Sequence, residues 1–261
     1  SGTTSGQITD AVSGAAVEGV YLEARKGHDM DHKPVLATGT TDSSGEYSFN
    51  LSKFGGYTIH ISKSGYINNR FYVVSCGNLG NQDGAISTNL PGPTSMRILL
   101  SWPKTDPVTG YDLDSHIYVP DNSTGMLHLY YGTTNKIIEY SATDNVTLDR
   151  DETDNPGTET VTVIQVKSGK TYSYSVHDYT NRDNASSCSS CTKLADSGAT
   201  VTVYLGTSLP GSDTVKKYYV PGGAGTLWKV FTFTESGGLK KVNTMTNVVT
   251  SSPNTSYGDV Y

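Results

Sequence analysis

Alternation of apolar and polar residues is the clearest pattern in the first third of the chain. Tyr47, Phe49 and Leu51 alternate with polar residues directly after the turn-forming run 42–45, and the stretch 55–66 follows as a second strand-like segment. Because successive side chains of a strand point to opposite faces of a sheet, the three apolar residues share one face. The pattern predicts two antiparallel strands that belong to a scaffold and carry no active site.

The pattern restarts after a segment rich in proline and glycine, residues 89–93, which neither a strand nor a helix is expected to cross. An apolar run over residues 96–102 then opens a second set of strands. A length of 261 residues suits two domains that each bury a core. We therefore predict a first domain over residues 1–93, a second over 94–250, and a carboxy-terminal tail over 251–261.

A family resemblance appears in the first domain. The residues that carry it are Gly6-Gln7-Ile8-Thr9-Asp10, Ser13-Gly14, Val17, Gly19-Val20, Thr41-Asp42, Gly45, Tyr47, Gly56-Tyr57 and Lys63-Ser64-Gly65-Tyr66. Together they resemble the carboxypeptidase-regulatory-like domain, a small transthyretin-type or immunoglobulin-like β-sandwich of many secreted bacterial proteins. The resemblance implies an extracytoplasmic structural or accessory module without catalytic residues of its own.

The second domain has its own series of motifs. They are a strand that ends in Trp (Met96 to Trp102), the strand Asp112 to Pro120, the segment Leu148 to Asp151 and the late strand Trp228 to Val230. This order resembles a family of bacterial extracytoplasmic β-sandwich domains with a DLDLHV-type strand, an LD.D strand and a W.V strand, whose function is poorly defined; Ser115 stands in place of the usual Leu. The two resemblances imply an all-β chain of two tandem Ig-like or transthyretin-like antiparallel β-sandwich domains.

Composition and charge narrow the classes of partner. A net charge of −6 without a Lys/Arg cluster argues against a nucleic-acid partner. No apolar run approaches the roughly 20 residues that cross a bilayer, so membrane insertion is not expected.

Tyr outnumbers Phe 18 to 5, which is typical of half-exposed aromatic side chains at subunit contacts and also of plain sheet propensity. A start at Ser1 fits a mature processed product and fits a shortened chain equally well.

Three cysteines are present. Cys188 and Cys191 form a CSSC motif in a polar loop, for which a local disulfide is the preferred interpretation in an oxidising compartment. A redox-active pair would need a helix amino-terminus, and a zinc site would need more cysteines. We expect Cys76 to be a buried free thiol.

Clustered aspartates invite a calcium hypothesis. Asp112, Asp114, Asp149 and Asp151 lie near predicted sheet ends, and Ca²⁺ takes six to eight oxygen ligands. The other interpretation is that these carboxylates cap turns and accept backbone hydrogen bonds. Beyond Ca²⁺, no cofactor is expected.

Histidines give a weaker signal for a metal. His116 and His177 are expected on neighbouring strands, and His28 and His32 at the tip of a hairpin. Three convergent ligands are not evident in either set, so solvated loop histidines are the preferred interpretation.

Catalytic signatures are missing from the sequence: there is no GxSxG, HExxH, Walker loop or GxGxxG after a strand. We therefore expect a protein that is not an enzyme.

These observations favour a structural subunit of an extracellular, pilus-like filament at the cell surface, whose partners are copies of itself. Open sheet edges allow a strand of one subunit to complete the sheet of the next, and such head-to-tail contacts propagate. The expected donor strand comprises Ser1, Gly2, Thr3, Thr4, Ser5, Gly6, Gln7, Ile8 and Thr9. Ile8 is its one bulky apolar residue, so the joint would rest mostly on backbone hydrogen bonds.

Two other functions stay open. One is an adhesin or accessory module that binds glycan or peptide through exposed aromatic side chains and a Ca²⁺-ordered loop. The other is a non-catalytic appendage of a secreted peptidase.

Overall fold

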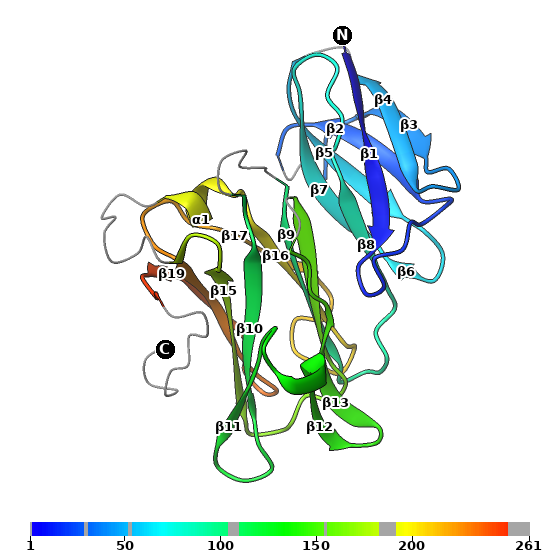
Figure 1. The fold of residues 1–261 in the computed structure, drawn as a ribbon. Helices are drawn as coiled ribbons and strands as arrows, with labels where there is room; N and C mark the ends of the chain where they lie inside the picture. Colours follow the sequence, from blue (N-terminus) through cyan, green and yellow to red (C-terminus); the bar gives the residue numbers. More distant parts are fainter. Residues whose placement is uncertain are drawn as a thin grey trace. The chain divides into compact units, whose positions relative to one another are not determined.

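A computed structural model of the protein describes residues 2–28, 31–51, 54–103, 110–153, 156–182 and 192–249. The described residues form strands almost throughout, which confirms the predicted all-β class (Figure 1). The chain divides into two compact units, unit 1 (Ser1–Asn89) and unit 2 (Leu90–Tyr261).

The strands of unit 1 are β1 (Gly2–Asp10), β2 (Tyr21–Lys26), β3 (Val35–Thr40), β4 (Glu46–Leu51), β5 (Gly55–Ser62), β6 (Tyr66–Ile67), β7 (Asn69–Ser75) and β8 (Gly84–Thr88). The strands of unit 2 are β9 (Met96–Trp102), β10 (Leu113–Pro120), β11 (Met126–Leu129), β12 (Ile137–Ser141), β13 (Asp144–Arg150), β14 (Gly157–Val163), β15 (Thr171–Asp178), β16 (Thr200–Leu205), β17 (Lys216–Tyr219), β18 (Leu227–Thr234) and β19 (Gly238–Thr246). A 3-10 helix, η1 (Thr134–Lys136), and a short α-helix, α1 (Lys193–Asp196), complete the described part of unit 2.

Unit 1 is a sandwich of two four-stranded sheets, ordered β4-β1-β8-β6 and β3-β2-β5-β7. Tyr47, Phe49 and Leu51 of β4 are buried and their neighbours are exposed, as the alternation predicts. They share one core with residues of the other sheet such as Ile59 and Ile61. Strands β4 and β5 are consecutive in the chain but lie in different sheets. The prediction that they form an antiparallel pair is therefore wrong.

Strand β1 lies inside its sheet, between β4 and β8 (Figure 1). Its first part, Gly2 to Gln7, pairs antiparallel with β4, and its last part, Ile8 to Asp10, pairs parallel with β8. The parallel pair departs from the purely antiparallel sheets that the sequence predicts.

Unit 2 is a larger sandwich. Its sheets are ordered β11-β10-β15-β18-β19 and β12-β13-β14-β9-β16-β17. Both Trp102 and Trp228 are fully buried in the core between them. Burial of such large aromatic side chains is a main source of the stability of a sandwich.

Strand β10 is buried along both of its faces. Leu113, Ile117 and Val119 point into the sandwich core, whereas Asp114 and His116 belong to the opposite face and are buried as well. The segment after β19 helps to cover that face, because Val248 packs with Tyr118 and Leu227. A face that is normally solvated in an antiparallel sheet is therefore removed from water here.

The cysteine predictions have two outcomes. Cys76 is exposed and not buried, because it follows the inward-pointing Ser75 at the end of β7 and so points outward. The predicted pair, Cys188 and Cys191, lies outside the described residues.

Within the described ranges, no helix has the length and apolar character that a membrane span requires.

Candidate functional site

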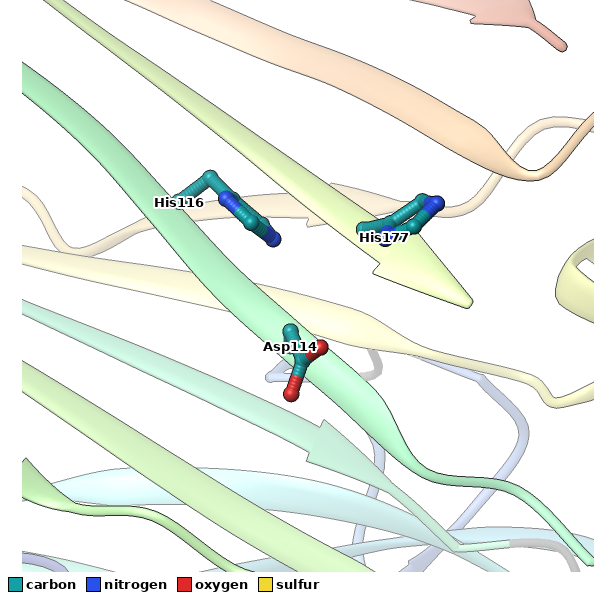
Figure 2. A group of neighbouring side chains, drawn as sticks. All are labelled: Asp114, His116 and His177. Atoms are coloured by element: carbon teal, nitrogen blue, oxygen red, sulfur yellow. The ribbon is translucent and has the colours of Figure 1, made fainter. Parts of the chain in front are cut away.

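Two neighbouring strands of unit 2 bring carboxylates and histidines together. Asp114 and His116 lie two residues apart on β10, and His177 of β15 is the cross-strand partner of Asp114 (Figure 2). The predicted neighbouring positions of the two histidines are thereby confirmed. Their predicted solvation is wrong, because both residues lie in strands and have 0% exposure. His28 and His32 do lie in an exposed loop.

The early part of β10 has an acidic neighbour in the opposite sheet. Strand β11 pairs with β10 only from Ile117 to Pro120. Ahead of that stretch, the backbone N–H of Ser115 donates a 2.6 Å hydrogen bond to Oε2 of Glu159 on β14. Glu159 is fully buried, and its carboxylate supplies an acceptor to the edge of β10, where no strand of the described residues pairs at this position.

Three carboxylates gather at this edge. Asp114, Asp151 and Glu159 each offer an oxygen atom, and these atoms lie within 4.8 Å of one another. Asp112 adds a further negative charge that acts on Asp114. Oδ1 of Asp112 and Oδ2 of Asp114 are buried without a hydrogen-bond partner.

The fourth predicted calcium ligand lies elsewhere. Asp149 accepts hydrogen bonds from the hydroxyl groups of Thr147 and Thr162, each at 2.5 Å. Glu159 therefore replaces Asp149 in the carboxylate group that the structure assembles. The calcium hypothesis itself stays a prediction.

Burial and mutual repulsion raise the pKa of these carboxyl groups. Burial, followed by the charges of Asp112 and Asp151, raises the pKa of Asp114 to about 9. Burial and the charge of Asp114 raise the pKa of Glu159 well above its usual range. Burial is also the first cause that raises the pKa of Asp112 to about 6. A bound cation would stabilise the ionised forms that burial disfavours.

The histidines are linked to further aromatic rings. Nδ1 of His116 lies 2.9 Å from Nε2 of His128, and the two rings stack with centroids 5.1 Å apart. His128 also stacks on Tyr118 and Tyr130, at 4.3 and 4.5 Å between centroids. Burial lowers the pKa of His116 well below its ordinary value, and burial is the first cause that lowers the pKa of His128 and of His177 to about 4. The three imidazoles are therefore neutral near neutral pH.

Sequence reasoning missed Glu159 and His128. A signal for Glu159 is present, because it is a charged residue among Thr and Val in a strand of otherwise high β-propensity. His128 has no such signal, because its place beside His116 depends on the register between β10 and β11.

In unit 1, the structure places the predicted donor strand in β1, apart from Ser1, which lies outside the described residues. The backbone on the side away from β4 is bonded to the segment before β8: Leu79 N–H donates to Thr3 O at 2.8 Å, Ser5 N–H to Leu79 O at 3.0 Å, and Gln82 N–H to Ser5 O at 3.0 Å. Together with the ladder to β4, these bonds give the strand partners on both sides. Ile8 is its fully buried apolar anchor.

Two glycines let β1 pass close to that segment. A Cβ atom on Gly2 would lie 2.0 Å from the carbonyl oxygen of Gly77, and one on Gly6 would lie 2.2 Å from that of Gln82. Both neighbours are backbone atoms, which cannot rotate away. A strand that lies in this position therefore needs glycine at the two points where the neighbouring backbone approaches.

Unit 1 is similar to a known domain family. Residues 3–82 match the model of the carboxypeptidase regulatory-like domain, a family of non-catalytic domains. The match confirms the resemblance predicted for the first domain. A search of curated proteins found no match.

Similar solved structures include pilins. The chain resembles BcpA, the major pilin subunit of Bacillus cereus, at 12% identity over 88% of this chain and 69% of that chain, with a TM-score of 0.28. It resembles the full-length major pilin SpaD of Corynebacterium diphtheriae at 12% identity over 84% of this chain and 63% of that chain, with a TM-score of 0.28. A Bacteroides uniformis protein described as a candidate carbohydrate-binding protein matches at 13% identity over 88% of this chain and 99% of that chain, with a TM-score of 0.26. Because these TM-scores are low, the proposals below depend on the chain's own strands and side chains.

Proposed function

We propose that this protein is a structural, non-enzymatic subunit of an extracellular pilus-like filament, in which β1 of one copy is inserted into unit 1 of the next. The observation that carries the proposal is the position of β1 between two partners. Without this strand, β4 and the segment 77–86 would have unpaired edges that face a common slot.

The slot suits a strand from another copy because its bonds are mostly between backbone atoms. An identical strand would make the same hydrogen bonds whether it comes from the same chain or from a neighbour. The close approach at Gly2 and Gly6 would admit this strand in one register and would reject strands with larger side chains there. Each subunit would accept one strand and donate one, so the contact would propagate as a filament.

Deletion of residues 1–9 tests the proposal. Filaments of the full chain, imaged by negative stain, are expected to disappear, and a folded protomer with an open slot should remain. A synthetic peptide with the sequence of residues 1–9 should then bind that protomer. The matched control is the same peptide with Gly6→Val, which should bind much more weakly because its Cβ atom would meet the backbone of Gln82.

Filaments that persist after the deletion would contradict strand donation. A full chain that stays monomeric at high concentration and binds a glycan array would instead favour an adhesin or accessory module.

A further inference from the structure

Asp114, His116 and His177 form a group of mixed nitrogen and oxygen ligands in unit 2. Each offers one ligand atom, and the three atoms lie within 4.8 Å of one another. The side chains project from the neighbouring strands β10 and β15 (Figure 2), and the two imidazole rings meet edge to face with centroids 5.7 Å apart. Paired strands hold these positions more rigidly than loops would.

Each of the three residues has a buried polar atom without a hydrogen-bond partner: Oδ2 of Asp114, Nε2 of His116 and Nδ1 of His177. The residues are 3%, 0% and 0% exposed. A buried polar atom without a hydrogen-bond partner costs about 1–3 kcal/mol of stability. Three such atoms on neighbouring residues therefore need an explanation.

The second ring nitrogen of each histidine is already bonded. Nε2 of His177 lies 3.2 Å from the carbonyl oxygen of Val248, which can only accept, so Nε2 carries the hydrogen and Nδ1 keeps a lone pair. Nδ1 of His116 faces Nε2 of His128 at 2.9 Å, and donation to that atom leaves a lone pair on Nε2 of His116. In metal sites, ligating histidines are oriented in this way by a bond from the other nitrogen.

We propose that Asp114, His116 and His177 bind a transition metal ion of the Zn²⁺ type. Two imidazole nitrogens and one carboxylate oxygen are ligands that Zn²⁺ accepts, whereas Ca²⁺ takes oxygen ligands almost exclusively. The site is therefore chemically distinct from the calcium hypothesis, although both would use Asp114. The inference does not depend on filament assembly.

The electrostatic setting favours a cation at this position. Both imidazoles are buried next to the Asp114 carboxyl group, and the neutral imidazole is the form that binds metal. Asp112 adds negative charge beside Asp114, whereas Asp151 is already ion-paired with Lys136. Arg182 acts against a cation, because its charge lowers the pKa of Asp114 and of His177.

Metal titration of the full chain tests the proposal. The three cysteines are replaced by Ser, because thiolates bind Zn²⁺. Isothermal titration with Zn²⁺ should show one tight site per chain, and Co²⁺ should give the visible absorption of a site with nitrogen ligands.

Substitution His177→Gln should weaken Zn²⁺ binding by about 100-fold or more. His128→Gln should weaken it by about 10- to 100-fold, as expected for a partner that orients a ligand. The matched control, His32→Gln, changes an exposed loop histidine and should leave the affinity unchanged.

Two results would overturn the site: equal Zn²⁺ affinity in the wild type and in His177→Gln, or full competition by equimolar Ca²⁺. Thermal unfolding without metal identifies a variant that fails to fold. If His177→Gln does not fold, Asp114→Asn is the second variant, and unchanged Zn²⁺ affinity in that variant would overturn the site equally.

Discussion

The two units bury their strands differently. In unit 1, β4 buries every second residue and exposes the others. In unit 2, all eight residues of β10 are buried. A polar residue on β4 faces solvent and needs no partner, but Asp114 and His116 on β10 are enclosed. It is the convergence of several such enclosed side chains with unpartnered atoms on β10 and β15 from which we infer a site.

The units also differ in what their key strands offer to a partner. Strand β1 of unit 1 is held mainly through its backbone, with small side chains where the neighbouring segment approaches. Strands β10 and β15 of unit 2 present titratable side chains. We therefore propose that unit 1 mediates assembly and that unit 2 binds a cation. Separate experiments can test the two proposals.

The largest effect is expected from pH in the absence of metal. The pKa of Asp114 is raised from an unfolded value of about 3.9 to about 9. A raised folded pKa stabilises the folded state at low pH, and this contribution is lost as pH rises toward the folded value. Between about pH 7 and 9, the histidines are largely neutral in both the folded and unfolded states. In that window the free energy of unfolding of unit 2 should fall by about 1.4 kcal/mol per pH unit for one such group, or about 3 kcal/mol in total.

Hydrogen exchange resolved by unit, with a chelator present, measures this slope. Asp114→Asn should make it less steep, with the part due to Glu159 remaining, and the control Asp149→Asn should leave it unchanged. Unit 1 should show no such slope, because the raised carboxyl pKa values of the described residues all belong to unit 2. Equal slopes in both units would contradict the comparison.

An intermediate effect is expected from Gly6→Val in β1. The new Cβ atom would lie 2.2 Å from a backbone oxygen, and overpacking of this kind costs about 1–3 kcal/mol. Denaturant unfolding should show unit 1 destabilised and unit 2 unchanged. Gly80→Ala is the control, because the nearest atom to its Cβ would be the Ser5 hydroxyl at 3.8 Å. Equal stability of the two variants would refute a slot specific for glycine.

The smallest effect separates two aspartates that the sequence does not distinguish. If Ca²⁺ binds at the carboxylate group, Asp151→Asn should weaken its affinity about tenfold, or about 1.4 kcal/mol. Asp149→Asn should leave the affinity unchanged, because both of its oxygens accept hydroxyl groups. Calcium titration monitored by the melting temperature measures both variants, and indifference of the melting temperature to a chelator would remove the calcium hypothesis.

Alternation and turn chemistry predicted individual strands, and the two family resemblances implied the all-β class. Residues 42–45 form a turn before β4, and Met96 to Trp102 form β9, as predicted. Sheet membership was not predictable from adjacent residues, because β4 and β5 cross to different sheets. The pairing of β1 with β8 likewise joins residues far apart in the chain.

The candidate site was predicted only in part, for a related reason. Asp114 and the neighbouring positions of His116 and His177 follow from the strand pattern. Their burial does not, because it depends on Val248 and other residues that cover the outer face. Glu159 reaches Ser115 from the other sheet, which no local pattern reveals.

Disulfide trapping tests strand donation most directly. Ser5 of β1 faces Ser48 of β4, and the backbone N–H and C=O of Ser5 are bonded on the other side, to Leu79 and Gln82. Opposed residues of this kind have Cα atoms about 4.5 Å apart, within the reach of a disulfide. The double variant Ser5→Cys, Ser48→Cys is assembled with Cys76→Ser and oxidised, with each single cysteine variant as a control. We predict a ladder of covalently linked chains on a non-reducing denaturing gel, absent from both controls. A crosslink confined to single chains would contradict strand donation.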